Sequence, residues 1–155
     1  MATVYDTPQY GSPAVGLPLG LVFVPVKYTV GSVAIAQSTG DYIRVCKLPK
    51  GAQIVPELCS IFADADPDSG ANLTVSLKVT DGTTTKTIIS TQNFQAIDTR
   101  LVASAADITG LGLFKTSNDD FYVKLTPEAG DLDAAAVIYV VVAYNMQTSF
   151  GAATT

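Results

Sequence analysis

The sequence contains no histidine and no tryptophan, and few charged residues. Without histidine there is no Ser-His-Asp triad, no Cys-His dyad and no imidazole metal ligand, which excludes many hydrolytic and metal-dependent sites. Charged residues make up 15% of the 155 residues, against about 25% in an average soluble domain, while apolar residues reach 48%. We therefore expect a surface that is either glycosylated or largely covered by other protein. The net charge of −5 disfavours binding to a phosphate backbone, so we expect no nucleic-acid partner.

Features of secretion and membrane insertion are also missing. The stretch Met1–Pro8 has no basic segment of the kind that opens a secretory signal. The longest apolar run, Leu19–Val26, contains Pro25 and is far shorter than the ~18–20 residues that span a bilayer, so no membrane partner is expected. The spacing of Cys46 and Cys59 places them out of register in the hairpin expected there. This favours two buried thiols in a reducing cytoplasm over a disulfide.

Residues 1–26 differ in composition from the rest of the chain. Proline and glycine alternate through this segment, which disfavours a regular helix or strand, yet Asp6 is its only charge. We predict an extended apolar arm that lies on a neighbouring subunit or on a shell beneath, with Tyr5, Tyr10, Leu17 and Phe23 as anchors. The alternative is that Leu19–Val26 forms the first strand of the protein's own domain.

Residues 27–146 show the alternation typical of β-strands. The clearest case is Leu73–Thr80, which would bury Leu73, Val75, Leu77 and Val79, and Asp81-Gly82 after it signals a hairpin. The apolar run 135–144 predicts a central strand buried on both faces. We expect Val137 and Tyr139, or their immediate neighbours, to share the core with the four inward residues of Leu73–Thr80. A single helix is expected over Thr99–Ile108, with Asp98 as its N-cap. Eight or nine short strands predict an all-β fold, an antiparallel sandwich of the jelly-roll type, followed by an uncharged tail over 147–155.

Three acidic groups are candidates for chemistry. Asp64, Asp66 and Asp68 resemble the start of a calcium loop, but Ser69 and Val75 stand where such a loop needs Gly and Glu. We therefore expect solvent-facing turn residues, no metal and no cofactor. Two further acidic pairs, Asp119-Asp120 and Asp131/Asp133, fall in expected turns, where charge discourages aggregation more often than it performs catalysis. The sequence accordingly predicts a protein that is not an enzyme.

Several segments together resemble a known group of proteins. They are IVPELCSIFADAD, LTVSLKVTDGTTTKTII, FQAIDTRLVASAADITGLGLFK and DDFYVKLTPEAGDLDAAAVIYVVVAYN. Over residues 41–145 the chain is similar to small structural proteins from the head gene modules of tailed bacteriophages. The resemblance implies a head-decoration or cement protein that is made in the host cytoplasm, sits on the phage head and forms trimers. It transfers no functional residue.

Taken together, the sequence predicts a homo-oligomeric virion protein that binds the capsid or neighbouring virion proteins. Two other hypotheses remain open. One is a glycan-binding or adhesin module, assisted by calcium at Asp64, Asp66 and Asp68. The other is a hydrolase that uses paired carboxylates.

Overall fold

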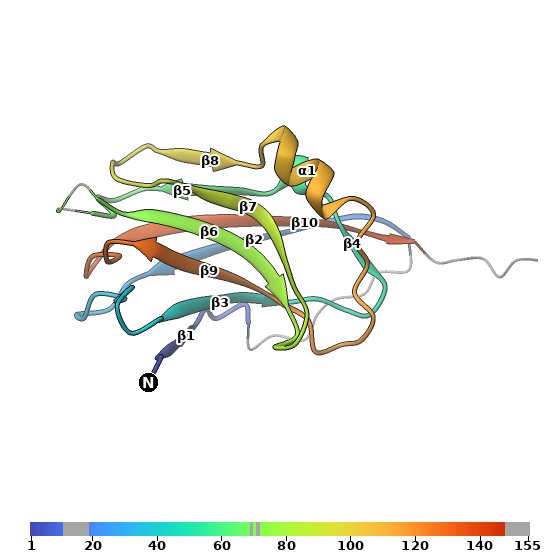
Figure 1. Cartoon of the computed structure of the whole chain (residues 1–155), viewed down its shortest axis with the longest axis horizontal. Coiled ribbons are helices and arrows are strands. Elements are labelled where there is room, and N and C mark those ends of the chain that lie inside the picture. Colours follow the sequence, from blue (N-terminus) through green and yellow to red (C-terminus); the bar gives the residue numbers. More distant parts are fainter. Residues whose placement is uncertain (11–18, 69, 71, 148–155) are drawn as a thin grey trace, which may run out of the picture.

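The computed structural model describes residues 1–10, 19–68, 70 and 72–147, which form two packed β-sheets (Figure 1). The first sheet contains, in spatial order, β1 (Val4–Asp6), β3 (Tyr42–Lys47), β9 (Tyr122–Ala129), β6 (Thr74–Thr80) and β7 (Thr85–Asn93). The second contains β2 (Leu19–Thr29), β10 (Val137–Gln147), β5 (Ser60–Ala63) and β8 (Arg100–Val102), with β4 (Ala52–Ile54) also paired to β10. The helical elements described are η1 (Pro56–Leu58) and α1 (Ala105–Leu111).

Strand pairing follows a nested order. The antiparallel pairs are β2 with β10, β3 with β9, β5 with β8, and β6 with β7, so the outermost strands pair first and the innermost last. This is the pairing pattern of an eight-stranded jelly roll. The antiparallel sandwich expected from the sequence is confirmed. The short β1 is an addition to this plan, since it pairs in parallel with β3.

The core lies between the sheets and matches the alternation of β6. Leu73, Val75, Leu77 and Val79 are fully buried, as predicted. The facing sheet contributes Ile138, among others. Ile138 is the immediate neighbour of Val137 and Tyr139, the two residues that the sequence placed in the core. The prediction that this last strand is buried on both faces is wrong for its first half. Val137 and Tyr139 are only half-buried, because they point out of the sandwich.

The sandwich begins earlier than residue 27. β2 starts at Leu19 and pairs with β10 over its whole length, so residues 19–26 belong to the protein's own sheet, as the alternative interpretation had it. Pro25 is accommodated because β2 is an edge strand. The Val30 amide donates to Ala136 of the partner segment at 2.8 Å, so the amides of even-numbered residues point at β10 and the Pro25 nitrogen faces the free edge.

The helix lies six residues beyond its predicted start. Residues 100–102 form β8 instead, and α1 begins after Ser104. Ser104 and Asp107 form a capping box, in which each side chain accepts a hydrogen bond from the other's backbone amide. Asp98 is not an N-cap. Its φ of 64° lies in the left-handed region, whereas an N-cap residue is extended.

Cys46 and Cys59 are buried free thiols, in agreement with the favoured interpretation. Burial raises the pKa of Cys46 to about 12 and that of Cys59 to about 11, so both stay protonated at neutral pH. Within the part of the chain that the structure describes, no helix is long and apolar enough to cross a bilayer.

Candidate functional site

The outer face of the second sheet is the most unusual surface of the molecule. Residues directly opposite each other in an antiparallel pair share a face, so the register places Phe23 beside Ala143, Pro25 beside Val141, and Tyr139 beside Phe62. We name this surface the apolar face and define it by Leu21, Phe23, Pro25, Phe62, Val102, Val137, Tyr139 and Val141. The side chains at its margins are open to solvent: Leu21 is 47%, Phe23 52% and Val102 46% exposed.

Charge is sparse on this face. The strands β2, β10, β5 and β8 contain Lys27 and Arg100 as their charged residues. These two lie in one row with an aromatic pair, in the order Lys27, Tyr139, Phe62, Arg100. The Lys27 ammonium lies 5.3 Å from the centre of the Tyr139 ring, whose centre is 6.4 Å from that of Phe62. A contiguous apolar patch bordered by polar groups is typical of a protein–protein interface.

The outer face of the first sheet is charged instead. Arg44 pairs with Asp6 at 2.6 Å, and Lys78 pairs with Glu128 at 2.5 Å. Although burial opposes it, hydrogen bonds from Lys78 and Ser76 hold the pKa of Glu128 below its ordinary value. These groups satisfy one another within the chain, so this face is suited to contact with water.

The four predicted anchor residues lie in different places. Tyr5 is half-buried in β1 against the core, and Tyr10 packs on the same chain, with its ring centre 4.2 Å from the Arg44 guanidinium and 5.9 Å from the ring centre of Tyr122. Phe23 is exposed on the apolar face. Leu17 lies outside the described residues. The sequence did not predict the rest of the apolar face, because the apolar side chains on the outward side of β10 were interpreted as buried inside the domain.

The acidic loop after β5 is only partly a solvated turn. Asp64 and Asp66 are exposed, as expected, but Asp68 is 5% exposed, so that expectation is wrong for Asp68. Its carboxylate accepts hydrogen bonds from the backbone amides of Gly70, Asn72 and Leu73. Because these amides lie ahead of the β6 ladder, Asp68 supplies the acceptors they would otherwise lack.

The other acidic pairs also tie loops together. Asp119 accepts the backbone amide of Lys50 at 2.7 Å, and Asp131 accepts that of Gln37 at 2.9 Å. In the described part of the chain, no group of three or more acidic or cysteine side chains is arranged to hold a metal ion. The observed role of Asp119 and Asp131 is to fix loop geometry.

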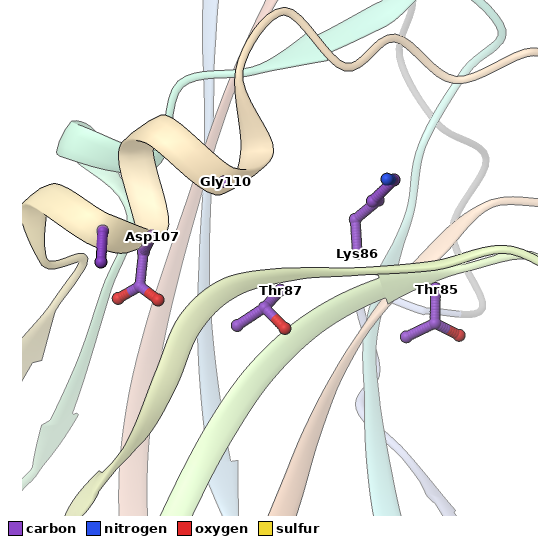
Figure 2. A pocket seen from close by; sticks show the side chains of 6 residues that line it. Thr85, Lys86, Thr87, Asp107 and Gly110 are labelled. Atoms are coloured by element: carbon purple, nitrogen blue, oxygen red, sulfur yellow. The ribbon is translucent and has the colours of Figure 1, made fainter.

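A shallow pocket of about 290 Å³ lies between β7 and α1. Figure 2 shows Thr85, Lys86 and Thr87 along β7 on one side, and Asp107 and Gly110 of α1 on the other. Asp107 is engaged as a cap: although burial opposes the charge, hydrogen bonds from Ser104 and Ser90 hold its pKa below the ordinary value. The residues that line this pocket pair no nucleophile with a base, so we assign it no chemistry.

Comparison with known proteins connects this fold to phage particles. No model of a known protein family matches the sequence, and no curated protein does. Among solved structures, a chain in the capsid of Ralstonia phage GP4 is 18% identical, with a TM-score of 0.64 over 96% of this chain and 100% of that one. The fold is that of a phage capsid chain. A chain in the capsid asymmetric unit of cyanophage Pam1 is also 18% identical, with a TM-score of 0.48 over 88% of this chain and 91% of that one. The match to the Ralstonia phage GP4 chain confirms, at the level of the fold, the resemblance to phage head proteins.

Proposed function

We propose that the protein is a non-enzymatic structural component of the virion of a tailed bacteriophage, which decorates or stabilises the capsid through protein–protein contacts. The observation that carries this proposal is the likeness in fold to a capsid chain, over 96% of this chain and 100% of that one. Because a fold alone does not define a function, the apolar face is the second support. A sheet surface with two charged residues among its four strands is suited to burial against protein.

The apolar face is where we place the contact with other virion proteins. Soluble monomers seldom expose apolar patches beyond a few hundred Å², and a stable interface covers about 800 Å² on each partner. Large apolar and aromatic side chains dominate interface energies, which makes Phe23 the leading contact residue. The protein self-associates through such contacts, with a trimer favoured on the phage resemblance, and it needs neither nucleic acid nor a membrane.

The first test is to measure the protein in purified particles. Hundreds of copies in each particle, on the head surface, are expected for a decoration protein, whereas about a dozen or fewer would indicate a neck, vertex or tail component. When the Phe23→Asp variant is added to particles that lack the protein, we expect that the particles no longer retain it. Thr91→Asp is the matched control, since Thr91 is also exposed on a strand but lies in the first sheet. Equal retention of both variants would contradict the proposal.

A glycan-binding module is the second candidate. Tyr139 and Phe62, with Lys27 and Arg100 at either end of the row, offer ring faces for a sugar and cations for acidic groups. The surrounding aliphatic side chains provide few hydrogen-bond donors, which ranks this candidate behind the structural role. Binding on a glycan array that is lost in Tyr139→Ala, and compared with and without EDTA, would favour it.

A further inference from the structure

The N-terminal strand occupies an edge of the first sheet without belonging to the eight-stranded plan. β1 lies against β3 at the margin of the sandwich (Figure 1) and is parallel to it, while every other described pairing is antiparallel. Both four-stranded sheets of the jelly roll are complete without β1. The segment 3–10 is therefore placed like a peptide added to a sheet edge.

The contacts that hold this segment are mostly polar. The Asp6 carboxylate accepts two hydrogen bonds from the Arg44 guanidinium, at 2.6 and 2.7 Å. Tyr10 stacks on the same guanidinium and its hydroxyl accepts a further hydrogen bond at 3.0 Å. Val4 is 39% exposed, and Tyr5, which is half-buried, packs against the core. Such contacts are specific in sequence, and Thr7 is the only residue of 3–10 that is buried.

The β3 edge, for its part, presents acceptors that fit the segment. A bulge between Arg44 and Cys46 leaves Val45 without a partner in β9, and the Val45 carbonyl accepts the Thr7 hydroxyl at 2.5 Å. The carboxylate of Asp41, which is 4% exposed, accepts the Thr3 amide at 2.6 Å. The segment therefore covers both acceptors and supplies a hydrogen-bond donor to each. These groups form a docking site for the segment 3–10.

The docked segment is joined to β2 by eight residues, 11–18, which span at most about 29 Å when extended. The contacts are the same whichever copy supplies the segment, so the effective concentration of each source decides which one binds. We propose that, in the assembled state, the β3 edge of one copy accepts residues 3–10 of a neighbouring copy. This inference rests on the proposed function, because a virion protein is held at high density beside its copies. Tyr5 and Tyr10 then become contacts between subunits.

Cross-linking in trans tests this exchange. Val4 and Tyr42 lie directly opposite each other. Full-length Val4→Cys protein is mixed with full-length Tyr42→Cys protein, assembled on particles, and treated with a short thiol-reactive cross-linker. Since neither copy carries both new cysteines, a Val4–Tyr42 cross-link forms between two copies only. The native Cys46 and Cys59 are buried and protonated, so they do not compete.

We expect a cross-linked dimer from this mixture and none when Leu113→Cys replaces Val4→Cys, because Leu113 is 83% exposed but lies outside both strands. Arg44→Ala in the accepting copy should reduce the yield. A double variant that cross-links only within one chain, with no dimer from the mixture, would overturn the exchange.

Particle retention, measured on the same samples, separates the exchange from the proposed virion role. If the protein is retained on particles but no cross-link forms between copies, the exchange alone is overturned. If a cross-link forms between copies in free oligomers that never bind particles, the virion role alone is overturned.

Discussion

The two sheets are built alike on the inside and differently on the outside. Both bury an alternating row of aliphatic residues, such as Leu77 in β6 and Ile138 in β10. The outward face of the first sheet pairs its charges within the chain, as in Lys78–Glu128, whereas the outward face of the second sheet is mostly apolar, with Lys27 and Arg100 as the charged residues of its strands. The inner rows determine the fold. The outer rows are free to vary, so the difference between them indicates which surface meets other proteins.

The largest expected effect concerns an inner row. Leu77→Ala should lower the free energy of unfolding by about 2–5 kcal/mol, because it opens a cavity at a fully buried site. Urea denaturation measures this loss. Its strand neighbour Lys78 points outward, so Lys78→Ala is the control and should cost about 0–1 kcal/mol. A loss below about 1 kcal/mol for Leu77→Ala would mean that the inward side of β6 is assigned incorrectly.

The next effect separates the two outer rows. Phe23→Ala should weaken self-association by at least about 2 kcal/mol, or roughly 30-fold in the dissociation constant, if Phe23 is a central contact. Thr91→Ala changes an exposed side chain of the first sheet, in the strand farthest from β1, and should change the dissociation constant little. Analytical ultracentrifugation over a concentration series compares them. If the wild-type protein stayed monomeric both in solution and on particles, there would be no self-association for Phe23→Ala to weaken, and the prediction would be wrong.

Strands and turns were predicted well where one local rule acts. The alternation of Leu73–Thr80 has one interpretation, and Asp81 fixes its hairpin by accepting the amides of Thr83 and Thr84. Prediction failed where two explanations fit the same residues. The Pro- and Gly-rich start of β2 resembles an arm until β10 is known to lie beside it.

The apolar run of β10 was misread for a related reason. An outward row that is covered by another protein has the same composition as a row buried inside the domain, so sequence alone does not distinguish the two. The buried position of Asp68 depends on a loop that folds back onto its own carboxylate, and hydrophobic periodicity carries no sign of it. The helix, by contrast, had a readable signal, since Ser104 and Asp107 match a capping box with Asp in place of Glu.

A moderate effect is expected in the loop between β5 and β6, which contains Asp68. Asp68→Ala should cost about 1–3 kcal/mol, because the amides of Gly70, Asn72 and Leu73 lose their acceptor. Asp66→Ala, two residues away and exposed, is the control and should cost well under 1 kcal/mol. Thermal unfolding followed by circular dichroism compares the two. Equal losses would show that the buried carboxylate has no special role.

The smallest effect tests whether the charged face contributes to stability at all. The pKa of Glu128 is lower in the folded protein than its ordinary value of 4.5, so the folded state binds this proton less readily than the unfolded state. The contribution of the Lys78–Glu128 pair is therefore present above the unfolded pKa and is lost as the pH falls through the folded one. For a pair that is partly open to solvent, this amounts to about 0–1 kcal/mol. Unfolding of wild-type protein and Glu128→Gln should differ slightly at pH 7 and converge in acid, below the folded pKa. A difference that persists unchanged in acid would mean that Glu128 acts through packing, and that the charges of this face are neutral for the fold.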